Sequence, residues 1–249
     1  MKRYISFSGG VESTTMCLLF GNKADAIFAD TGFEHELLYE RIDKVEKAVR
    51  AFHGNNFKVI RIKSEKHGSL KDYIVKQKFY PSPLMRFCTA KFKIEPIDAF
   101  LKTQSDCELM IGLNADEQQR VGNHGLLTNV TYSYPLIELN INRAKCEQIL
   151  NAVGLHPHFP AYMQRGGCVG CFFKSKKEYV AMALLNEDEF DQVMQIEESI
   201  QDKRDSFYSI LGNITLRELK TQAKASLFPA LEMYPEKQFF TNCGVFCHR

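Results

Sequence analysis

A glycine pair near the start of the chain constrains the fold more than any other feature. Ser8-Gly9-Gly10 follows the short apolar stretch Tyr4-Ile5-Ser6-Phe7 and precedes an apolar run that extends to Phe20. A strand that turns through glycines into a helix is typical of the first unit of an α/β domain, and the free N–H groups of such a helix start attract anions. Ser13 and Thr14 place hydroxyl groups in the first helical turn, where they would donate to a phosphate. The alternative is a plain strand–helix connection.

The sequence that follows repeats the alternation of strands and helices. Further strands are predicted at residues 24–29, 57–62, 109–113 and 134–137, and helices at 35–52 and 143–153. This alternation predicts an α/β fold with a Rossmann-like, doubly wound parallel sheet. Beyond residue 172, charged stretches at 177–185, 187–202 and 215–226 indicate a helical C-terminal appendage. We therefore expect a sheet domain at 1–165 and a cysteine-bearing helical region at 166–249.

Composition narrows the class of protein. The 249 residues are 45% hydrophobic and 25% charged, as in a globular protein with a sizeable core. No apolar run is long enough to cross a bilayer, and Met1 to Ile5 leads straight into a strand pattern without a signal peptide, so we expect a cytoplasmic protein and no membrane partner. The net charge of +2 neither demands nor excludes nucleic acid, although basic residues are in excess between 61 and 93.

Eight cysteines are many for a chain in a reducing compartment, where ligands and reactive thiols are commoner than disulfides. Cys17 and Cys107 lie in apolar runs and Cys146 lies on a predicted helix, so these three are expected to be packed thiols. The segment Cys168-Val169-Gly170-Cys171 can place two thiolates on one centre, in keeping with zinc, iron–sulfur or redox use. The remaining cysteines are Cys88, Cys243 and Cys247.

The segment Ser8-Gly9-Gly10-Val11-Glu12-Ser13-Thr14 resembles the SGGxDS signature of the PP-loop ATP pyrophosphatases, the adenine nucleotide alpha hydrolase group, with Glu12 in place of Asp. Within that group the chain is similar to the phosphoadenosine phosphosulfate reductase family. The segments that carry this similarity are Asp30-Thr31-Gly32, Arg86-Phe87-Cys88-Thr89 with Lys93, Gly112 to Arg120 with Asn114 in place of Arg, and Tyr134-Pro135-Leu136. Together they occur in family order over about two-thirds of the chain.

This resemblance implies a PP-loop nucleotide-binding domain and a set of site residues. The nucleotide-binding residues that it implies are Ser8, Gly9, Gly10, Glu12, Ser13, Thr14, Asp30, Thr31, Gly32, Arg86, Gly112 and Asp116. Lys93 and Arg120 are cations suited to a polyphosphate and are expected to be catalytic. Asp116 and Glu117 follow a predicted strand and would help to hold Mg²⁺, with helix N-capping as the alternative.

The resemblance also implies a metal centre. Cys168 lies 80 positions after Cys88, a separation similar to that of cluster-binding cysteines in sulfonucleotide reductases of the adenylyl-sulfate type. The expected centre is a [4Fe–4S] cluster held by Cys88, Cys168, Cys171 and either Cys243 or Cys247. A three-cysteine cluster with an open iron is one alternative, and zinc is another. The segment around Cys243 partly resembles the reductases' C-terminal ECGLH element, so Cys243 is expected to be either the catalytic nucleophile or a cluster ligand.

The activity that this resemblance implies is an ATP pyrophosphatase of the sulfurtransferase type, which converts ATP to AMP and pyrophosphate while adenylating a substrate. A cysteine desulfurase would supply the sulfur that displaces AMP. The chain is similar in kind to DNA-phosphorothioation proteins, so DNA and other phosphorothioation proteins are expected partners. One alternative is a sulfonucleotide reductase that releases sulfite with thioredoxin. Another is a non-catalytic nucleotide- or DNA-binding subunit, suggested by the departures at Glu12 and Asn114.

Overall fold

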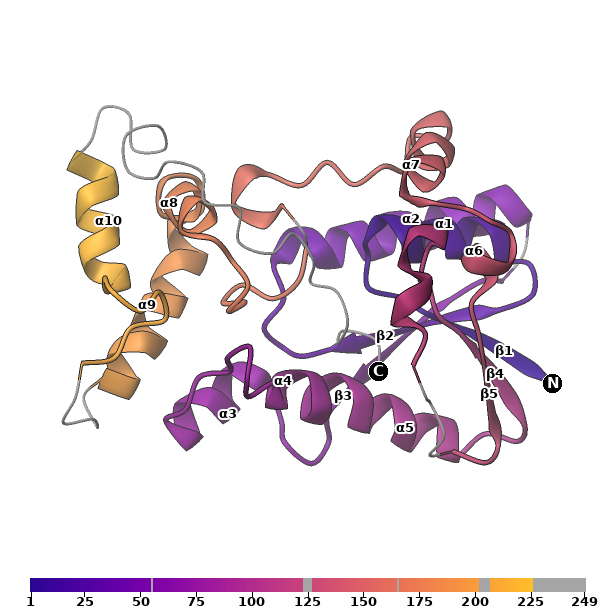
Figure 1. Cartoon of the computed structure of the whole chain (residues 1–249), viewed down its shortest axis with the longest axis horizontal. Helices are drawn as coiled ribbons and strands as arrows, with labels where there is room; N and C mark the ends of the chain where they lie inside the picture. Colours follow the sequence, from indigo (N-terminus) through magenta and orange to yellow (C-terminus); the bar gives the residue numbers. More distant parts are fainter. Residues whose placement is uncertain (55, 123–126, 165, 202–206, 226–249) are drawn as a thin grey trace.

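The computed structural model describes residues 1–54, 56–122, 127–164, 166–201 and 207–225. Within these residues, parallel strands form one five-stranded sheet in the order β3-β2-β1-β4-β5 (Figure 1). The strands are β1 (Lys2–Ser6), β2 (Asp25–Asp30), β3 (Val59–Lys63), β4 (Cys107–Met110) and β5 (Val130–Ser133). In the register of the three central strands, Ile5 pairs with Ala26 on one side and Met110 on the other. The predicted Rossmann-like parallel sheet is confirmed.

Helices cover both faces of the sheet (Figure 1). One layer contains α1 (Val11–Phe20), α2 (Glu36–His53) and α7 (Arg143–Ala152). The other contains α3 (Leu70–Gln77), α4 (Phe87–Thr89), the π-helical turn η1 (Ala90–Ile94) and α5 (Glu95–Lys102). Because side chains alternate along a strand, Ile5 packs into the core under the first layer and Tyr4 into the core under the second.

The predicted fifth strand is wrong in position. Residues 134–137 were expected to be extended, but β5 ends at Ser133 and Pro135–Glu138 form the short helix α6. Pro135 lies at the start of that helix, where its fixed φ is favourable and its missing N–H removes nothing. The strand that forms instead alternates polar and apolar residues at the edge of the sheet, so its pattern is weaker than that of a buried parallel strand.

The C-terminal part is helical, as predicted, with α8 (Lys176–Leu185), α9 (Glu187–Gln201) and α10 (Leu216–Ala225) beyond the carboxyl ends of the strands (Figure 1). Glu197 of α9 is 2% exposed and accepts hydrogen bonds from Leu216 N at 2.6 Å and Ile210 N at 2.8 Å. It thereby caps α10 from a neighbouring helix. One apolar core continues from the sheet into these helices, so the division at residue 165 stays a prediction.

A buried polar chain joins the helical part to the sheet. His35, which precedes α2, contacts Glu189 of α9 through Nδ1 at 2.5 Å. Lys174 Nζ lies 3.2 Å from the other ring nitrogen of His35 and donates to Tyr162 O at 2.6 Å. Burial lowers the pKa of Lys174, and the carboxylate of Glu178 opposes that effect. These contacts fix the segment that follows Cys171 against the start of α2. Among the described residues, no helix combines the length and the apolar character needed to cross a membrane.

Candidate functional site

The loop between β1 and α1 has the geometry of an anion-binding turn. Gly9 has φ +77°, in the region that favours glycine, and a Cβ there would lie 2.6 Å from Leu38 Cδ1. Gly10 is the N-cap of α1 and contributes no side-chain cap. The first turn of α1 therefore presents backbone N–H groups that a phosphate can satisfy.

The hydroxyl groups of this loop support the loop itself. Ser13 Oγ lies 3.2 Å from both the backbone N and the Oγ of Ser8. Thr14 is fully buried, and its hydroxyl donates to Gly10 O at 2.7 Å. The hydrogen of the Thr14 hydroxyl is thus used within the protein, whereas phosphate contact by Ser13 stays a prediction.

A buried arginine that was not anticipated from the sequence holds the back of the loop. Arg41 of α2 donates through Nε to Gly9 O at 2.6 Å, and through Nη2 to Thr14 Oγ1 at 3.0 Å and Leu155 O at 3.1 Å. Burial lowers its pKa to about 10, against the opposing effect of Cys17. The available signal was its position, three residues after Leu38 on the apolar stripe of an amphipathic helix, where a charged residue needs a buried partner.

The turn after β2 is fixed by its own side chains. Asp30 Oδ1 accepts from Gly32 N at 2.8 Å and from the hydroxyl of Tyr39 at 2.7 Å. Gly32 has φ +69°, and a Cβ there would lie 2.8 Å from Ser69 Cβ. Thr31 donates to Glu34 Oε1 at 2.8 Å. Asp30 therefore shapes the turn, and Thr31 is the member of the triplet that reaches the cavity described below.

The loops that follow β1 and β4 flank the point where the sheet order reverses. Strands β2 and β3 lie on one side of β1, and β4 and β5 lie on the other. A Cβ at Gly112, just beyond β4, would lie 3.4 Å from Ser13 N, so the two loops are in close contact. Ligands of open α/β sheets bind at such a switch point, beyond the carboxyl ends of the strands.

Beyond Gly112, Asn114 joins two carboxylates. Its Nδ2 lies 3.3 Å from Glu12 Oε1 and 3.1 Å from Glu117 Oε2. Its Oδ1 accepts from Asp116 N at 2.9 Å and caps the 3-10 turn η2 (Ala115–Arg120). The N-capping considered for Asp116 and Glu117 is thus performed by Asn114. Glu117 also forms an ion pair with Arg120.

The C-x-x-C segment packs against the turn after β2. Cys168 forms an isolated β-bridge with Glu34, and Val169 N donates to Phe33 O at 2.9 Å. Cys171 N donates to Cys168 O at 3.2 Å, which closes the turn. The carbonyl oxygen of Gly170 accepts from Tyr80, so the loop is held from two sides.

Cys88 lies in α4 and lines the same cavity as Cys168 and Cys171. A hydrogen bond with Cys171, together with burial, raises the pKa of Cys168 well above that of a free thiol. Burial raises the pKa of Cys88, and the positive charge of Lys93 opposes that effect. Cys17, Cys107 and Cys146 are buried in the cores, as predicted. Cys243 and Cys247 lie outside the described residues.

The three cavity cysteines are chemically suited to a thiophilic metal or an iron–sulfur cluster. Cys168 and Cys171 are hydrogen-bonded, and Cys171 is near enough to Cys88 to raise its pKa. Across the described ranges, no group of three or more His, Cys, Asp or Glu side chains is close enough together to hold a metal ion. The three cysteines line one cavity, and their binding of a metal or cluster stays a prediction.

Two cations border the cysteines. Arg86, the N-cap of α4, lies over the rings of Phe172 and Phe173, with its guanidinium carbon 5.7 and 4.7 Å from their centroids. Lys93 is on η1 and lines the cavity, and its charge lowers the pKa values of Glu34, Cys88 and Cys168 against the larger effects that raise them. Both cations are placed to meet an anion that lies between the loop and the cysteines.

One cavity of about 960 Å³ brings most of the predicted site residues together. Those that line it are Ser8, Gly10, Glu12, Thr31, Arg86, Cys88, Lys93, Gly112, Asp116, Arg120, Cys168 and Cys171. Five other predicted residues lie behind its wall: Gly9, Ser13, Thr14, Asp30 and Gly32. The anion-binding turn and the three thiols therefore open onto a shared space.

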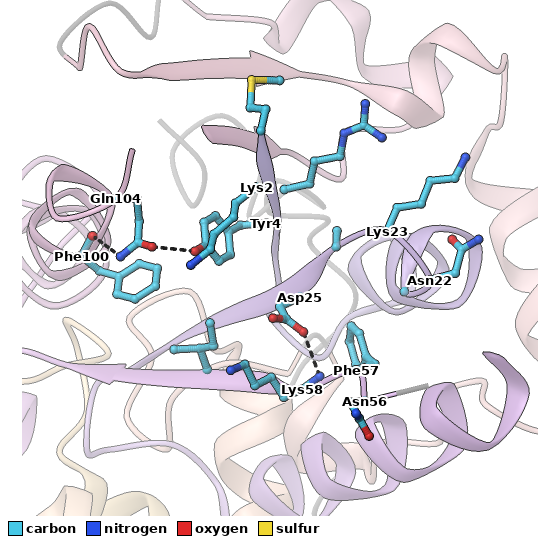
Figure 2. Close-up of a pocket in the computed structure, with 15 residues that line it drawn as sticks. Lys2, Tyr4, Asn22, Lys23, Asp25, Asn56, Phe57, Lys58, Phe100 and Gln104 are labelled. Carbon is cyan, nitrogen blue, oxygen red and sulfur yellow. Dashed lines mark hydrogen bonds between the residues drawn. The ribbon is translucent and has the colours of Figure 1, made fainter. Parts of the chain in front are cut away.

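A second hollow, of about 720 Å³, lies at the opposite, amino edge of the sheet (Figure 2). Polar groups there bind one another: Tyr4 donates to Gln104 Oε1 at 2.9 Å, and Lys58 N donates to Asp25 Oδ1 at 3.1 Å. None of the site residues predicted from the sequence lines it. The larger cavity is therefore the candidate site.

Comparisons with known proteins give one family match. The family model described as the phosphoadenosine phosphosulfate reductase domain matches residues 2–133. Similar solved structures include phosphoadenylyl-sulfate reductase from Candida auris in a phosphate complex, with 16% identity, 63% of this chain and 74% of that chain covered, and a TM-score of 0.47. Another is the U34-tRNA thiolase NcsA from Methanococcus maripaludis with its [4Fe-4S] cluster. Its sequence identity is 17%, the match covers 89% of this chain and 80% of that chain, and the TM-score is 0.48. No curated protein matches the chain.

Proposed function

The chain belongs to the phosphoadenosine phosphosulfate reductase domain family, and we propose that it is an enzyme of that family that uses ATP to activate an acceptor for sulfur transfer. An oxygen of the acceptor attacks the α-phosphorus of ATP, the bond to the β-phosphate breaks, and pyrophosphate leaves. Sulfur at the oxidation level of sulfide then replaces that oxygen, and AMP leaves with it. A cysteine desulfurase supplies the sulfur as a persulfide, which takes up two electrons from external thiols before transfer.

The shared cavity is the observation that carries this proposal. Ser8 and Gly10 of the anion-binding turn, which contains a glycine at φ +77°, line the same cavity as Cys88, Cys168 and Cys171. A chain that only bound a nucleotide would have no need for three cysteines in the same space. Adenylation and sulfur delivery must meet at a single acceptor atom, and one cavity satisfies that requirement.

Each group has a role that follows from its charge. The N–H groups at the start of α1 bind phosphate oxygens, and Lys93 and Arg120 neutralise the charge that develops on pyrophosphate. The carboxylates of Asp116 and Glu117 hold Mg²⁺. Cys88, Cys168 and Cys171 would hold a [4Fe–4S] cluster, which supplies an iron that can bind sulfur. By the resemblance to DNA-phosphorothioation proteins, the proposed acceptor is a phosphate of DNA.

A second candidate function is reduction of a sulfonucleotide with thioredoxin. The match of the reductase domain over residues 2–133 favours it. It requires Cys243 as the nucleophile, and this residue lies outside the described part of the chain. Sulfite production that is lost in Cys243→Ser would support reduction, and full sulfite production by that variant would exclude the mechanism.

Replacing Lys93 with alanine tests the proposed activity. We expect pyrophosphate release from ATP, measured with duplex DNA, cysteine desulfurase and cysteine present, to fall roughly 100-fold because one cation facing the leaving group is removed. Lys91→Ala is the matched control: Lys91 lies on the same turn but contacts the ring of Tyr73 and does not line the cavity. Equal rates in the two variants would contradict the role given to Lys93, and no pyrophosphate from the unaltered enzyme would contradict the ATP reaction.

A further inference from the structure

Arg143 is a cation at the mouth of the cavity that the sequence motifs do not include. It is the first residue of α7, and its Nη1 lies 2.7 Å from Glu12 Oε1. Its Nε lies 2.8 Å from Glu147 Oε1, one helical turn further on. Glu12 belongs to the first turn of α1, so the Arg143 side chain reaches from α7 to the anion-binding turn.

The position of Arg143 is fixed by packing of its helix. Helix α7 packs against α1, and Cys146 is fully buried and hydrogen-bonded to Thr15 of α1. The backbone N of Arg143 also lies 3.4 Å from Asp116 Oδ2. These contacts fix the backbone of Arg143 next to the first turn of α1.

A shorter side chain, that of Asn114 beyond the end of β4, contacts the same Glu12 carboxylate. Asn114 Nδ2 lies 3.3 Å from Glu12 Oε1, so the amide and the Arg143 guanidinium meet at one oxygen. An amide carries no charge and cannot neutralise a polyphosphate. Arg120, the cation of this segment that is proposed to neutralise the leaving pyrophosphate, forms its ion pair with Glu117. Two arginines of the described residues reach this turn: Arg41 binds it from behind, and Arg143 contacts the Glu12 carboxylate on the side that lines the cavity.

The ion pair between Arg143 and Glu12 is suited to exchange of partners. The Arg143 side chain is 49% exposed and the Glu12 side chain 19%, and an ion pair that is open to water on one side contributes little net free energy. A magnesium polyphosphate brings a cation that prefers carboxylate oxygens and an anion that prefers guanidinium groups. When the magnesium polyphosphate enters, the Glu12 carboxylate would bind the metal and the Arg143 guanidinium would bind the phosphates.

We propose that Arg143 binds the β- and γ-phosphates of ATP, with Glu12 holding its guanidinium in place until the nucleotide enters. This inference rests on the proposed ATP reaction. Arg143 would favour ATP over AMP, because an arginine at the polyphosphate end of the site contributes to binding of the triphosphate and not to binding of the monophosphate.

Isothermal titration of three variants tests this role, with Mg²⁺ and either α,β-methylene-ATP or AMP as ligand. Arg143→Ala should weaken the binding of the triphosphate analogue roughly 10- to 100-fold, because a bidentate phosphate contact is lost, and should change AMP affinity less than about twofold. Arg143→Lys should give an intermediate affinity for the analogue. Lys145→Ala removes one positive charge from the exposed face of the same helix and should change neither affinity.

The outcomes separate this inference from the proposed function. If Arg143→Ala binds the analogue as tightly as the unaltered protein does, Arg143 does not bind the phosphates, although the ATP reaction stands. Equal weakening of AMP and the analogue would show a structural role and would also overturn the inference. If the unaltered protein binds AMP but not the analogue, both proposals fail.

Discussion

Arg41→Met is expected to weaken ATP binding roughly 10- to 100-fold, because the loop loses hydrogen bonds from a charged group that are worth about 1.5–3 kcal/mol. The substitution removes the donors to Gly9 O, Thr14 Oγ1 and Leu155 O, which are 2.6, 3.0 and 3.1 Å from the guanidinium. Without them the loop loses its support from behind. Two buried carbonyl oxygens are also left without a donor, so the free energy of unfolding should fall by about 3 kcal/mol. Nucleotide titration and denaturant unfolding measure the two effects.

Lys44→Met is the matched control for this variant. Lys44 is on the exposed side of the same helix. Its substitution also replaces a positively charged side chain by methionine, but leaves the contacts of the loop intact. We expect nucleotide affinity and unfolding free energy to stay near those of the unaltered protein. An Arg41→Met protein that is equally stable and binds ATP normally would show that the loop keeps its geometry without the buried guanidinium.

Cys88→Ser, Cys168→Ser and Cys171→Ser are each expected to abolish iron binding after anaerobic reconstitution. All three thiols line the cavity, and a [4Fe–4S] cluster that loses one of few thiolate ligands is not retained. Iron and sulfide analysis, together with the visible absorption band, measures the loss. ATP affinity should stay within about twofold in each variant, because the three cysteines lie on segments other than the anion-binding turn.

Cys107→Ala serves as the control, since Cys107 is fully buried on β4 and does not line the cavity. It should bind iron like the unaltered protein. Retention of a full iron complement by any one of the three serine variants would remove that cysteine from the ligand set. A protein that takes up zinc and no iron would contradict the cluster and favour the zinc alternative.

The sheet was predictable from short-range patterns because parallel strands buried on both faces are short, apolar and followed by helices. The central strands β2 and β4 follow this rule most closely, and the glycine pair after β1 indicates the site directly. The two edge strands differ from it: β3 was found through its alternation of apolar and polar residues, whereas the four residues of β5 gave no clear pattern. The apolar Tyr134-Pro135-Leu136-Ile137, which was predicted instead, belongs mostly to a helix that begins at the proline.

The site residues that belong to a sequence motif could be predicted, whereas those that reach the site only through tertiary contacts were missed. Arg41 and Arg143 come from helices that no phosphate-binding pattern includes, and only the packing of α2 and α7 against α1 brings them to the loop. Asn114 stands where the family resemblance has an arginine, and the structure shows Arg143 at the same carboxylate, Glu12. A contact made from another helix cannot be found by inspecting the motif alone.

The most direct measurement is the electron paramagnetic resonance spectrum of the reconstituted, reduced protein, recorded with and without saturating α,β-methylene-ATP and Mg²⁺. If the nucleotide and the cysteine centre share one cavity, the protein should show a reduced [4Fe–4S] signal, and the analogue should shift it by changing the charge and solvent beside the cluster. Binding of the analogue, proven by titration of the same sample, with an unchanged cluster spectrum would contradict a shared site for ATP cleavage and sulfur transfer.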